Sequence, residues 1–239
     1  MSIGANLSFT HRFEPASRPG IPPLLLLHGT GGDENDLLPL GRRIAAGAAL
    51  VSPRGKVLEG GMPRFFRRLS EGVFDEADVT RRAHELADFV EEMRDAYRLP
   101  APVAVGFSNG ANIAAALLVL RPGVLAGAAL MRAMVPLQNP PAADLAGTRA
   151  ILLSGAHDPI VPAANAAKLA SMLVGSGADV RHETLPTGHG VTEADVGTIQ
   201  AWISASPGAA DRQLPRQGTQ TAAAGGSLHS GPIAQGGTP

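Results

Sequence analysis

The stretch that decides the fold runs from Val103 to Leu120 and reads VAVGFSNGANIAAALLVL. It opens with an apolar run typical of a buried strand and closes with an apolar helical segment. Between them, residues 106–110 form a Gly-x-Ser-x-Gly motif centred on Ser108. A sharp turn at this point would lift the serine oxygen above the sheet edge, and the glycines would leave room for neighbouring backbones. The motif alone also fits a plain glycine-rich turn, so its surroundings have to decide.

Apolar runs and amphipathic segments alternate along the chain to about residue 205. The runs, each bounded by Gly, Pro or Ser, are Leu24–Leu27, Ala48–Val51, Val103–Phe107, Val124–Met131 and Ala150–Leu153. Helices are expected over residues 35–46, 79–97 (with Asp78 as its N-cap), 109–121, 163–175 and 193–204, and an edge strand near residues 7–13. Runs that are apolar on both faces are typical of parallel strands. The pattern predicts an α/β fold, a mostly parallel central sheet with helices on both faces and no separate cap domain.

Composition limits the domain organisation and the class of partner. The chain has 239 residues and a formal net charge of −1, which counts against binding to nucleic acid or to an anionic membrane. We expect one domain over residues 1–205 and a disordered low-complexity tail over residues 206–239. No apolar stretch approaches the ~18 residues that span a bilayer, and no signal-peptide pattern opens the chain, so a cytoplasmic location is expected. The absence of cysteine excludes disulfides, thiolate metal sites and a cysteine nucleophile.

A serine nucleophile needs a base and an orienting acid, and both have candidates after later strands. Asp158 follows the run that ends at Leu153, and His189 follows a plausible strand over residues 180–185. Both would lie at the carboxyl edge of the sheet, where Ser108 also lies and where open α/β sheets bind ligands. The weaker alternatives are Asp144, Asp179 and Asp195 for the acid, and His11, His157, His182 and His229 for the base.

An oxyanion hole is the third requirement, because backbone N–H groups must meet the charge that develops on the attacked carbonyl. One donor would be the N–H of Asn109, directly after the nucleophile. The second is expected from Thr30, in the glycine-rich loop 28–32 after an early strand. That loop lacks the full spacing of a phosphate-binding motif, so a nucleotide site is disfavoured. His28 is expected to be a structural partner beneath the loop.

Four segments together resemble the phospholipase/carboxylesterase family of α/β hydrolases, which includes acyl-protein thioesterases and bacterial carboxylesterases. They are residues 28–34 (HGTGGDE), 106–110 (GFSNG), 158–162 (DPIVP) and 188–190 (GHG). The resemblance covers nearly all of residues 20–205. It implies the α/β-hydrolase fold, with Ser108 as nucleophile, His189 as base and Asp158 as its orienting carboxylate. It also implies Thr30 and Asn109 as oxyanion donors.

Residues 52–75 are similar to a bacterial carboxylesterase subgroup, some members of which are linked to quinone or hydroquinone resistance. They lack the Trp-Phe-Asp stretch usual in the eukaryotic-type thioesterases, which counts against long-chain acyl-protein substrates. The stretch concentrates scarce large side chains, namely Met62, Phe65, Phe66 and Phe74. They either wall an acyl pocket or pack the loop down. Arg64, Arg67 and Arg68 are expected to form a solvated face.

The sequence thus predicts a serine carboxylesterase that cleaves esters of small to medium acyl groups through an acyl-enzyme. An acyl-thioesterase or lysophospholipase on the same triad is the alternative, and a non-catalytic receptor-like binding module is a further one. No metal or organic cofactor is implied. The expected partner is a small-molecule ester or thioester. Neither a nucleic-acid partner nor stable membrane insertion is expected, and the sequence leaves open whether the chain forms a homodimer. Dienelactone hydrolases normally use a cysteine nucleophile and haloalkane dehalogenases an aspartate, so both are disfavoured.

Overall fold

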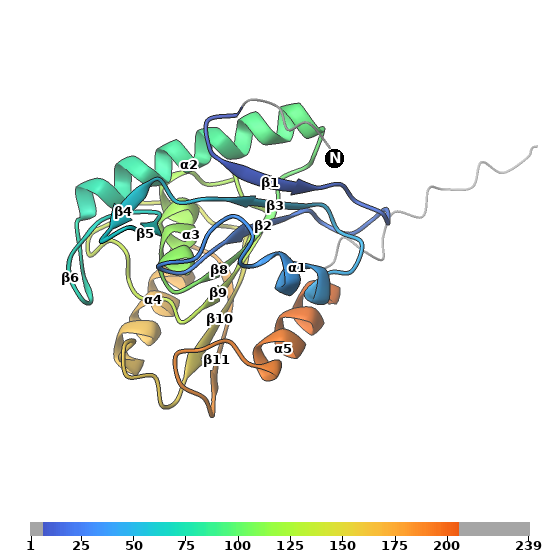
Figure 1. The fold of residues 1–239 in the computed structure, drawn as a ribbon. Coiled ribbons are helices and arrows are strands. Elements are labelled where there is room, and N and C mark those ends of the chain that lie inside the picture. The colour runs from blue at the N-terminus through green and yellow to red at the C-terminus, as the bar shows by residue number, and fades with distance from the viewer. Residues whose placement is uncertain (1–6, 206–239) are drawn as a thin grey trace, which may run out of the picture.

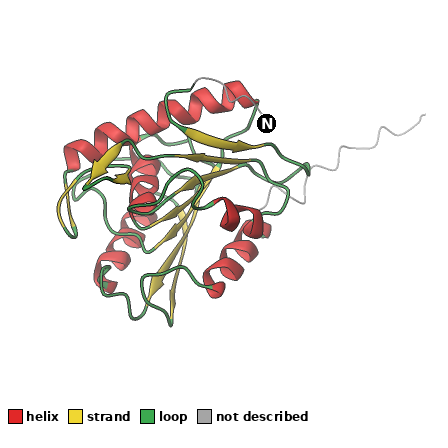
Figure 2. Cartoon of the chain, in the orientation of Figure 1, coloured by secondary structure: helices red, strands yellow, loops and turns green. Residues whose placement is uncertain are grey.

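A seven-stranded sheet forms the centre of the computed structural model, which describes residues 7–205 (Figures 1 and 2). The expected tail lies outside the described residues. In spatial order the strands are β1 (His11–Glu14), β3 (Leu50–Pro53), β2 (Leu24–Leu27), β8 (Val103–Phe107), β9 (Gly127–Met131), β10 (Arg149–Gly155) and β11 (Asp179–Leu185). Every pair is parallel except β1 with β3, which confirms the mostly parallel sheet. The edge strand expected near residues 7–13 is β1, which begins only at His11 and runs antiparallel to β3.

Helices cover both faces of the sheet. The helices α1 (Leu38–Ile44) and α5 (Glu193–Ser204) lie together on one face, and α2 (Glu76–Tyr97), α3 (Asn109–Leu120) and α4 (Ala163–Gly175) lie on the other (Figure 1). Side chains of β2 alternate between the two layers: Leu24 and Leu26 pack with α1 and α5, whereas Leu25 and Leu27 pack with α2 and α3. Four consecutive leucines are therefore fully buried, as the apolar run predicted.

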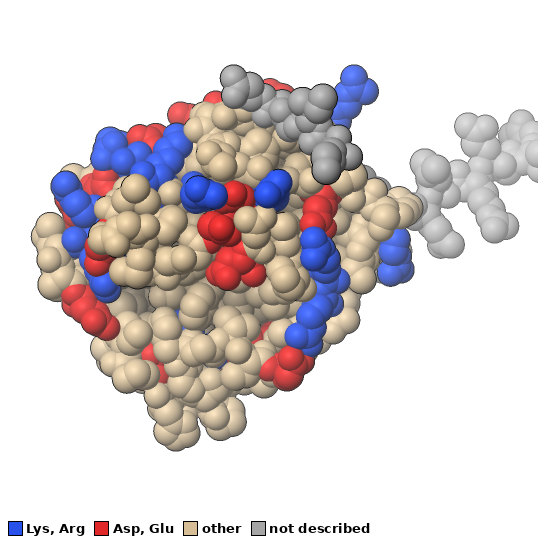
Figure 3. All heavy atoms as spheres, viewed as in Figure 1, with Lys and Arg blue, Asp and Glu red and all other residues tan. Residues whose placement is uncertain are grey.

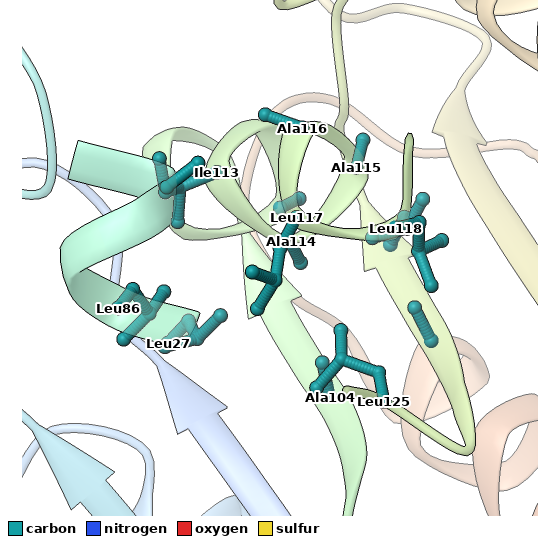
Figure 4. Close-up of a cluster of buried hydrophobic side chains, with 14 of the residues drawn as sticks. Leu27, Leu86, Ala104, Ile113, Ala114, Ala115, Ala116, Leu117, Leu118 and Leu125 are labelled. Carbon is teal, nitrogen blue, oxygen red and sulfur yellow. The ribbon is translucent and has the colours of Figure 1, made fainter. Parts of the chain in front are cut away.

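Helix α3 is buried all round, which explains why its sequence has no polar face. Ile113, Leu117 and Leu118 pack among side chains from β2, α2 and the loop before β9 (Figure 4). Alanines at 111 and at 114–116 let the helix backbone approach its neighbours closely. The residue before this helix is Ser108, so the core of the molecule fixes the position of the serine.

Helix α2 begins earlier than expected and has a different N-cap. The residue that caps it is Asp75, not Asp78: its extended backbone (φ −79°) brings its carboxylate within 3.1 Å of the Asp78 N–H. Asp78 instead lies inside the first turn, where it accepts a hydrogen bond from the Arg67 N–H at 2.7 Å. The apolar periodicity starts only at Val79 because the first turn of the helix carries acidic residues, which favour a helix N-terminus.

Two small hairpins replace the loop expected between residues 52 and 75. They are β4 (Val57–Glu59) with β5 (Met62–Arg64), and β6 (Arg68–Ser70) with β7 (Val73–Phe74).

Basic and acidic side chains lie interleaved over the face of the molecule in Figure 3, so charge of one sign does not dominate this view. Within residues 7–205 no helix is both long and apolar enough to cross a bilayer.

Candidate active site

Ser108 stands on a strained turn between β8 and α3. Its φ is 51° and its ψ −112°, a conformation that non-glycine residues rarely adopt and that marks functional sites. The flanking glycines are required by space. A Cβ at Gly106 would lie 2.6 Å from the Gly110 carbonyl oxygen, and a Cβ at Gly110 would lie 2.0 Å from the Leu27 carbonyl oxygen. The turn is therefore the strand-to-helix elbow that the motif predicted, not a loosely packed glycine loop.

The structure brings Ser108, His189 and Asp158 into one hydrogen-bonded chain. His189 Nε2 lies 3.1 Å from Ser108 Oγ, and His189 Nδ1 lies 2.8 Å from Asp158 Oδ2. An ionised carboxylate only accepts hydrogen bonds, so the Nδ1 proton points to Asp158 and Nε2 is left to accept the serine proton. The ring is in the tautomer that a general base needs.

Asp158 is held in place by the turn that follows it. Its Oδ1 accepts hydrogen bonds from the backbone N–H groups of Ile160 (2.8 Å) and Val161 (3.1 Å), and its side chain is 1% exposed. Burial raises the pKa of Asp158, but the hydrogen bonds from Ile160, His189 and Val161 outweigh it and leave the pKa below its ordinary value. The carboxylate therefore stays ionised while buried.

The other acidic and basic candidates lie elsewhere. Asp144 accepts a hydrogen bond from the Ala146 N–H, and Asp179 stands at the start of β11. His11 bonds the Tyr97 hydroxyl, and His182 bonds the Ser154 hydroxyl on the neighbouring strand. His229 lies outside the described residues. Asp195 is buried in an ion pair with Arg132, a residue that the sequence did not single out.

Thr30 and Asn109 both line the small cavity above Ser108. In the part of the chain that the structure describes, neither backbone N–H donates to a protein acceptor. The loop around Thr30 is fixed from two sides: the Gly31 N–H donates to the Pro63 carbonyl at 3.0 Å, and Gly31 has a φ of 85° that favours glycine. Two free donors beside a serine oxygen can stabilise an oxyanion.

His28 lies beneath this loop as a structural partner. Its Nδ1 donates to the Gly29 carbonyl at 2.7 Å, and its Nε2 accepts from the Gly55 N–H at 3.0 Å. The ring is fully buried, and this burial holds the pKa of His28 below its ordinary value despite the Gly29 hydrogen bond. A neutral imidazole thus joins the Thr30 loop to the segment before the first hairpin.

The four large side chains between residues 62 and 74 lie in three different environments. Phe74 lines the cavity, whereas Phe65 and Phe66 are buried in the core beneath it. The Phe65 N–H donates to Asn109 Oδ1 at 2.7 Å, which ties the hairpin region to the serine turn. Met62 is 44% exposed at the start of β5, and it is not among the lining residues.

The arginines of the hairpins do not form one solvated face. Arg67 lies on the surface beside Asp75, as expected. Arg64, in contrast, is 3% exposed: its Nη1 donates to Thr30 Oγ1 at 2.7 Å and its Nε to the Phe66 carbonyl at 3.2 Å. Arg64 and Arg68 both line the cavity, and both pair with Glu59. Burial of Arg64 is tolerated because polar partners from three separate segments surround its guanidinium.

Further lining residues were not predicted from the sequence. They are Glu71, Gly72, Asn112, Arg132, Met134, Ile160 and Val161. Asn112 was the most accessible to prediction, since it follows Ser108 by one helical turn. Arg132 also carries a signal: it is a charged residue directly after an apolar strand, at the same sheet edge as the serine. Within residues 7–205 no group of three or more histidine and acidic side chains could hold a metal ion.

Known proteins similar to this chain identify its family. The family model of phospholipases and carboxylesterases matches residues 12–206. MhqD of Bacillus subtilis (strain 168), a hydrolase by name, is 45% identical over 181 residues, which cover 75% of this chain and 90% of MhqD. The crystal structure of a carboxylesterase from Bacillus cereus is 42% identical, with a TM-score of 0.81 over 83% of this chain and 95% of that one.

A carboxylesterase from Mesorhizobium loti gives a similar result, at 33% identity and a TM-score of 0.80. The match covers 84% of this chain and 97% of that structure. Neither carboxylesterase leaves a substantial part of its own chain unmatched, so the likeness extends over the whole fold and is not confined to one motif. The fold, the serine turn and these relatives lead to one conclusion: the chain belongs to the phospholipase/carboxylesterase family of α/β hydrolases.

Proposed function

We propose that the protein is a serine carboxylesterase that hydrolyses esters of small acyl groups at Ser108. The observation that carries the proposal is the hydrogen-bonded chain from Ser108 through His189 to the buried Asp158. It supplies a nucleophile, a base in the required tautomer and a fixed negative charge for the imidazolium.

The reaction follows from the positions of these atoms. Ser108 Oγ attacks the ester carbonyl carbon while His189 Nε2 takes its proton, and Asp158 stabilises the imidazolium that forms. The N–H groups of Thr30 and Asn109 receive the negative charge on the carbonyl oxygen. When the C–O bond breaks, Nε2 returns the proton to the leaving alcohol. Water then attacks the carbonyl carbon of the acyl-enzyme while His189 Nε2 takes its proton. The bond between the acyl carbon and Ser108 Oγ breaks, Nε2 returns the proton to Oγ, and the acid leaves.

The cavity favours a short acyl group. Its volume is about 40 Å³, whereas a single water needs at least ~10–15 Å³ by the same measure. Its wall is mixed: Phe74, Met134 and Val161 are apolar, but the two hairpin arginines and Asn112 are polar. A long alkyl chain would displace water from these polar groups without replacing its hydrogen bonds, which costs binding free energy.

Labelling with a fluorophosphonate probe tests the nucleophile. The probe should attach at Ser108, and Ser108→Ala should lose both the label and the hydrolysis of p-nitrophenyl acetate. Ser154→Ala is the matched control, because Ser154 also hydrogen-bonds a histidine, His182, at 2.9 Å. In residues 7–205 no carboxylate hydrogen-bonds His182, so this variant should keep full labelling. A label that persists in Ser108→Ala would overturn the proposal.

A panel of acetate, butyrate and octanoate esters, with the matching thioesters, tests the substrate class. We expect kcat/KM to be highest for acetate or butyrate esters and to fall for octanoate. A kcat/KM that rises with chain length would contradict the small-acyl assignment. A preference for thioesters at equal chain length would favour an acyl-thioesterase on the same triad.

A further inference from the structure

Arg132 is the most extensively bonded side chain near the catalytic loops. It follows β9 directly, has a φ of 55° and is fully buried. Its N–H donates to the Leu153 carbonyl at 2.8 Å, which continues the ladder between β9 and β10 by one residue. A left-handed conformation in a bulky residue is rare and persists only where surrounding contacts hold it. These contacts come from the guanidinium.

All five N–H donors of the Arg132 guanidinium are engaged by the protein. Nη1 and Nη2 form a two-pronged pair with the Asp195 carboxylate at 2.7 and 2.9 Å, and both side chains are 0% exposed. Nη1 also donates to the Leu153 carbonyl at 3.1 Å. The remaining donors reach the loop after β11: Nε donates to the Gly188 carbonyl and Nη2 to the Gly190 carbonyl, each at 3.0 Å.

These two carbonyls belong to the residues on either side of His189. One planar guanidinium therefore fixes the carbonyl groups of both residues that flank the histidine. The loop is also packed closely against β10, since a Cβ at Gly155 would lie 2.4 Å from the Gly188 carbonyl oxygen. Asp195, the third residue of α5, in turn accepts from the Thr192 N–H at 2.8 Å and so joins the ion pair to the start of that helix.

Stability alone does not account for this arrangement. Buried ion pairs contribute little net stability, and apolar replacements of similar volume are often neutral or stabilising. What an apolar pair could not do is donate to two carbonyls at fixed positions. We infer that Arg132, held by Asp195, is a positioning residue that sets where the His189 ring stands relative to Ser108. The inference rests on the proposed function.

Loss of the Arg132 guanidinium should lower kcat without a matching change of KM. The Arg132 donors are used by the protein, so substrate binding should not depend on them, although the residue borders the cavity. A displacement of about 1 Å between reacting groups can cost ~100-fold in rate. Arg132→Met should therefore lower kcat for p-nitrophenyl acetate about 100-fold. Fluorophosphonate labelling of Ser108 should slow by a similar factor, because it needs the same base.

Variants of the ion pair separate positioning from stability. Arg132→Met leaves Asp195 charged and unpaired, so its Tm should fall, whereas Arg132→Met with Asp195→Asn removes both charges and should regain much of the Tm. The double variant should still have a low kcat, because the Gly188 and Gly190 carbonyls keep no arginine. Arg132→Lys keeps the charge but cannot span both carbonyls, so its kcat should lie between wild type and Arg132→Met.

Ile199→Ala is the matched control. Ile199 is fully buried on α5, one turn beyond Asp195, and its truncation should lower the Tm while leaving kcat unchanged well below the Tm. If kcat recovers together with the Tm in the double variant, or if KM rises while kcat stays constant, the positioning role is refuted. Failure of wild-type labelling at Ser108 would instead refute the proposed function, so the two failures are distinguishable. If Arg132→Met does not fold, the lysine and double variants carry the test.

Discussion

Replacing Asp158 by asparagine should nearly abolish activity while leaving the fold intact. The reason lies in the two backbone N–H groups of Ile160 and Val161, which donate to Oδ1 at 2.8 and 3.1 Å. An asparagine must place its amide oxygen there, because an amide NH₂ at that position would face two donors and lose both hydrogen bonds. Its NH₂ group then takes the place of Oδ2, 2.8 Å from His189 Nδ1.

The substituted amide would thus donate to Nδ1 and move the histidine proton to Nε2. A protonated Nε2 cannot accept the Ser108 proton, so the base is in the wrong tautomer. The corresponding change in a serine protease lowers kcat about 10,000-fold, which is about 5 kcal/mol in the barrier. We expect a similar loss here, measured as kcat for p-nitrophenyl acetate, with a Tm close to that of wild type.

Asp144→Asn is the matched control for this experiment. Asp144 also accepts a hydrogen bond at Oδ1 from the N–H two residues later, at 3.0 Å, but no histidine within residues 7–205 hydrogen-bonds it. Its amide variant should keep wild-type kcat. An Asp158→Asn enzyme with kcat within about tenfold of wild type would refute the tautomer reasoning and leave another carboxylate to orient the base.

Two further predictions concern stability. Gly110→Ala should lower the free energy of unfolding by about 3 kcal/mol or more, because its Cβ would lie 2.0 Å from a backbone oxygen. Gly197→Ala on α5 is the control: its Cβ would meet no atom within 4 Å, so it should raise the free energy of unfolding by ~0.5–1 kcal/mol. Equal Tm changes in the two variants would contradict the close packing at the serine turn. The free energy of unfolding should also rise with pH below ~6.5, because burial lowers the pKa of His28 and the unfolded chain binds a proton there that the folded chain does not. Urea titrations from pH ~5 to ~7 give the free energy of unfolding at each pH, and it should rise less steeply with pH in His28→Gln than in wild type. An equal rise with pH in both proteins would count against a neutral buried His28.

The sheet and the serine turn could be predicted because their signals are local. Four leucines in succession, with proline before them and His28-Gly29 after them, indicate a strand buried on both faces, and β2 spans these four leucines in the structure. The steric need for Gly106 and Gly110 is likewise local, since both flank one turn. Asp158 and His189 followed from their positions after strands, because parallel strands present their carboxyl ends at one edge.

The buried arginines could not be predicted, because what makes burial tolerable is distant in sequence. Arg64 is held by Thr30, which lies 34 positions away, and Arg132 by Asp195, which lies 63 away. A charged side chain considered by itself is expected to be solvated. The hairpins between residues 57 and 74 were missed for a different reason: strands of two or three residues are too short to show alternation.

The burial of α3 gives Ser108 and His189, the proposed nucleophile and base, unequal resistance to thermal fluctuation. Ser108 directly precedes a helix whose residues are buried along most of its length, so displacing the serine requires opening the centre of the protein. His189, in contrast, lies on a loop that a few side chains anchor, and its side chain is 20% exposed. Local opening free energies span from near zero at loops to the global value in cores. On warming, the base should therefore lose its alignment well before the nucleophile does, and heat inactivation would begin in the loop that Arg132 holds.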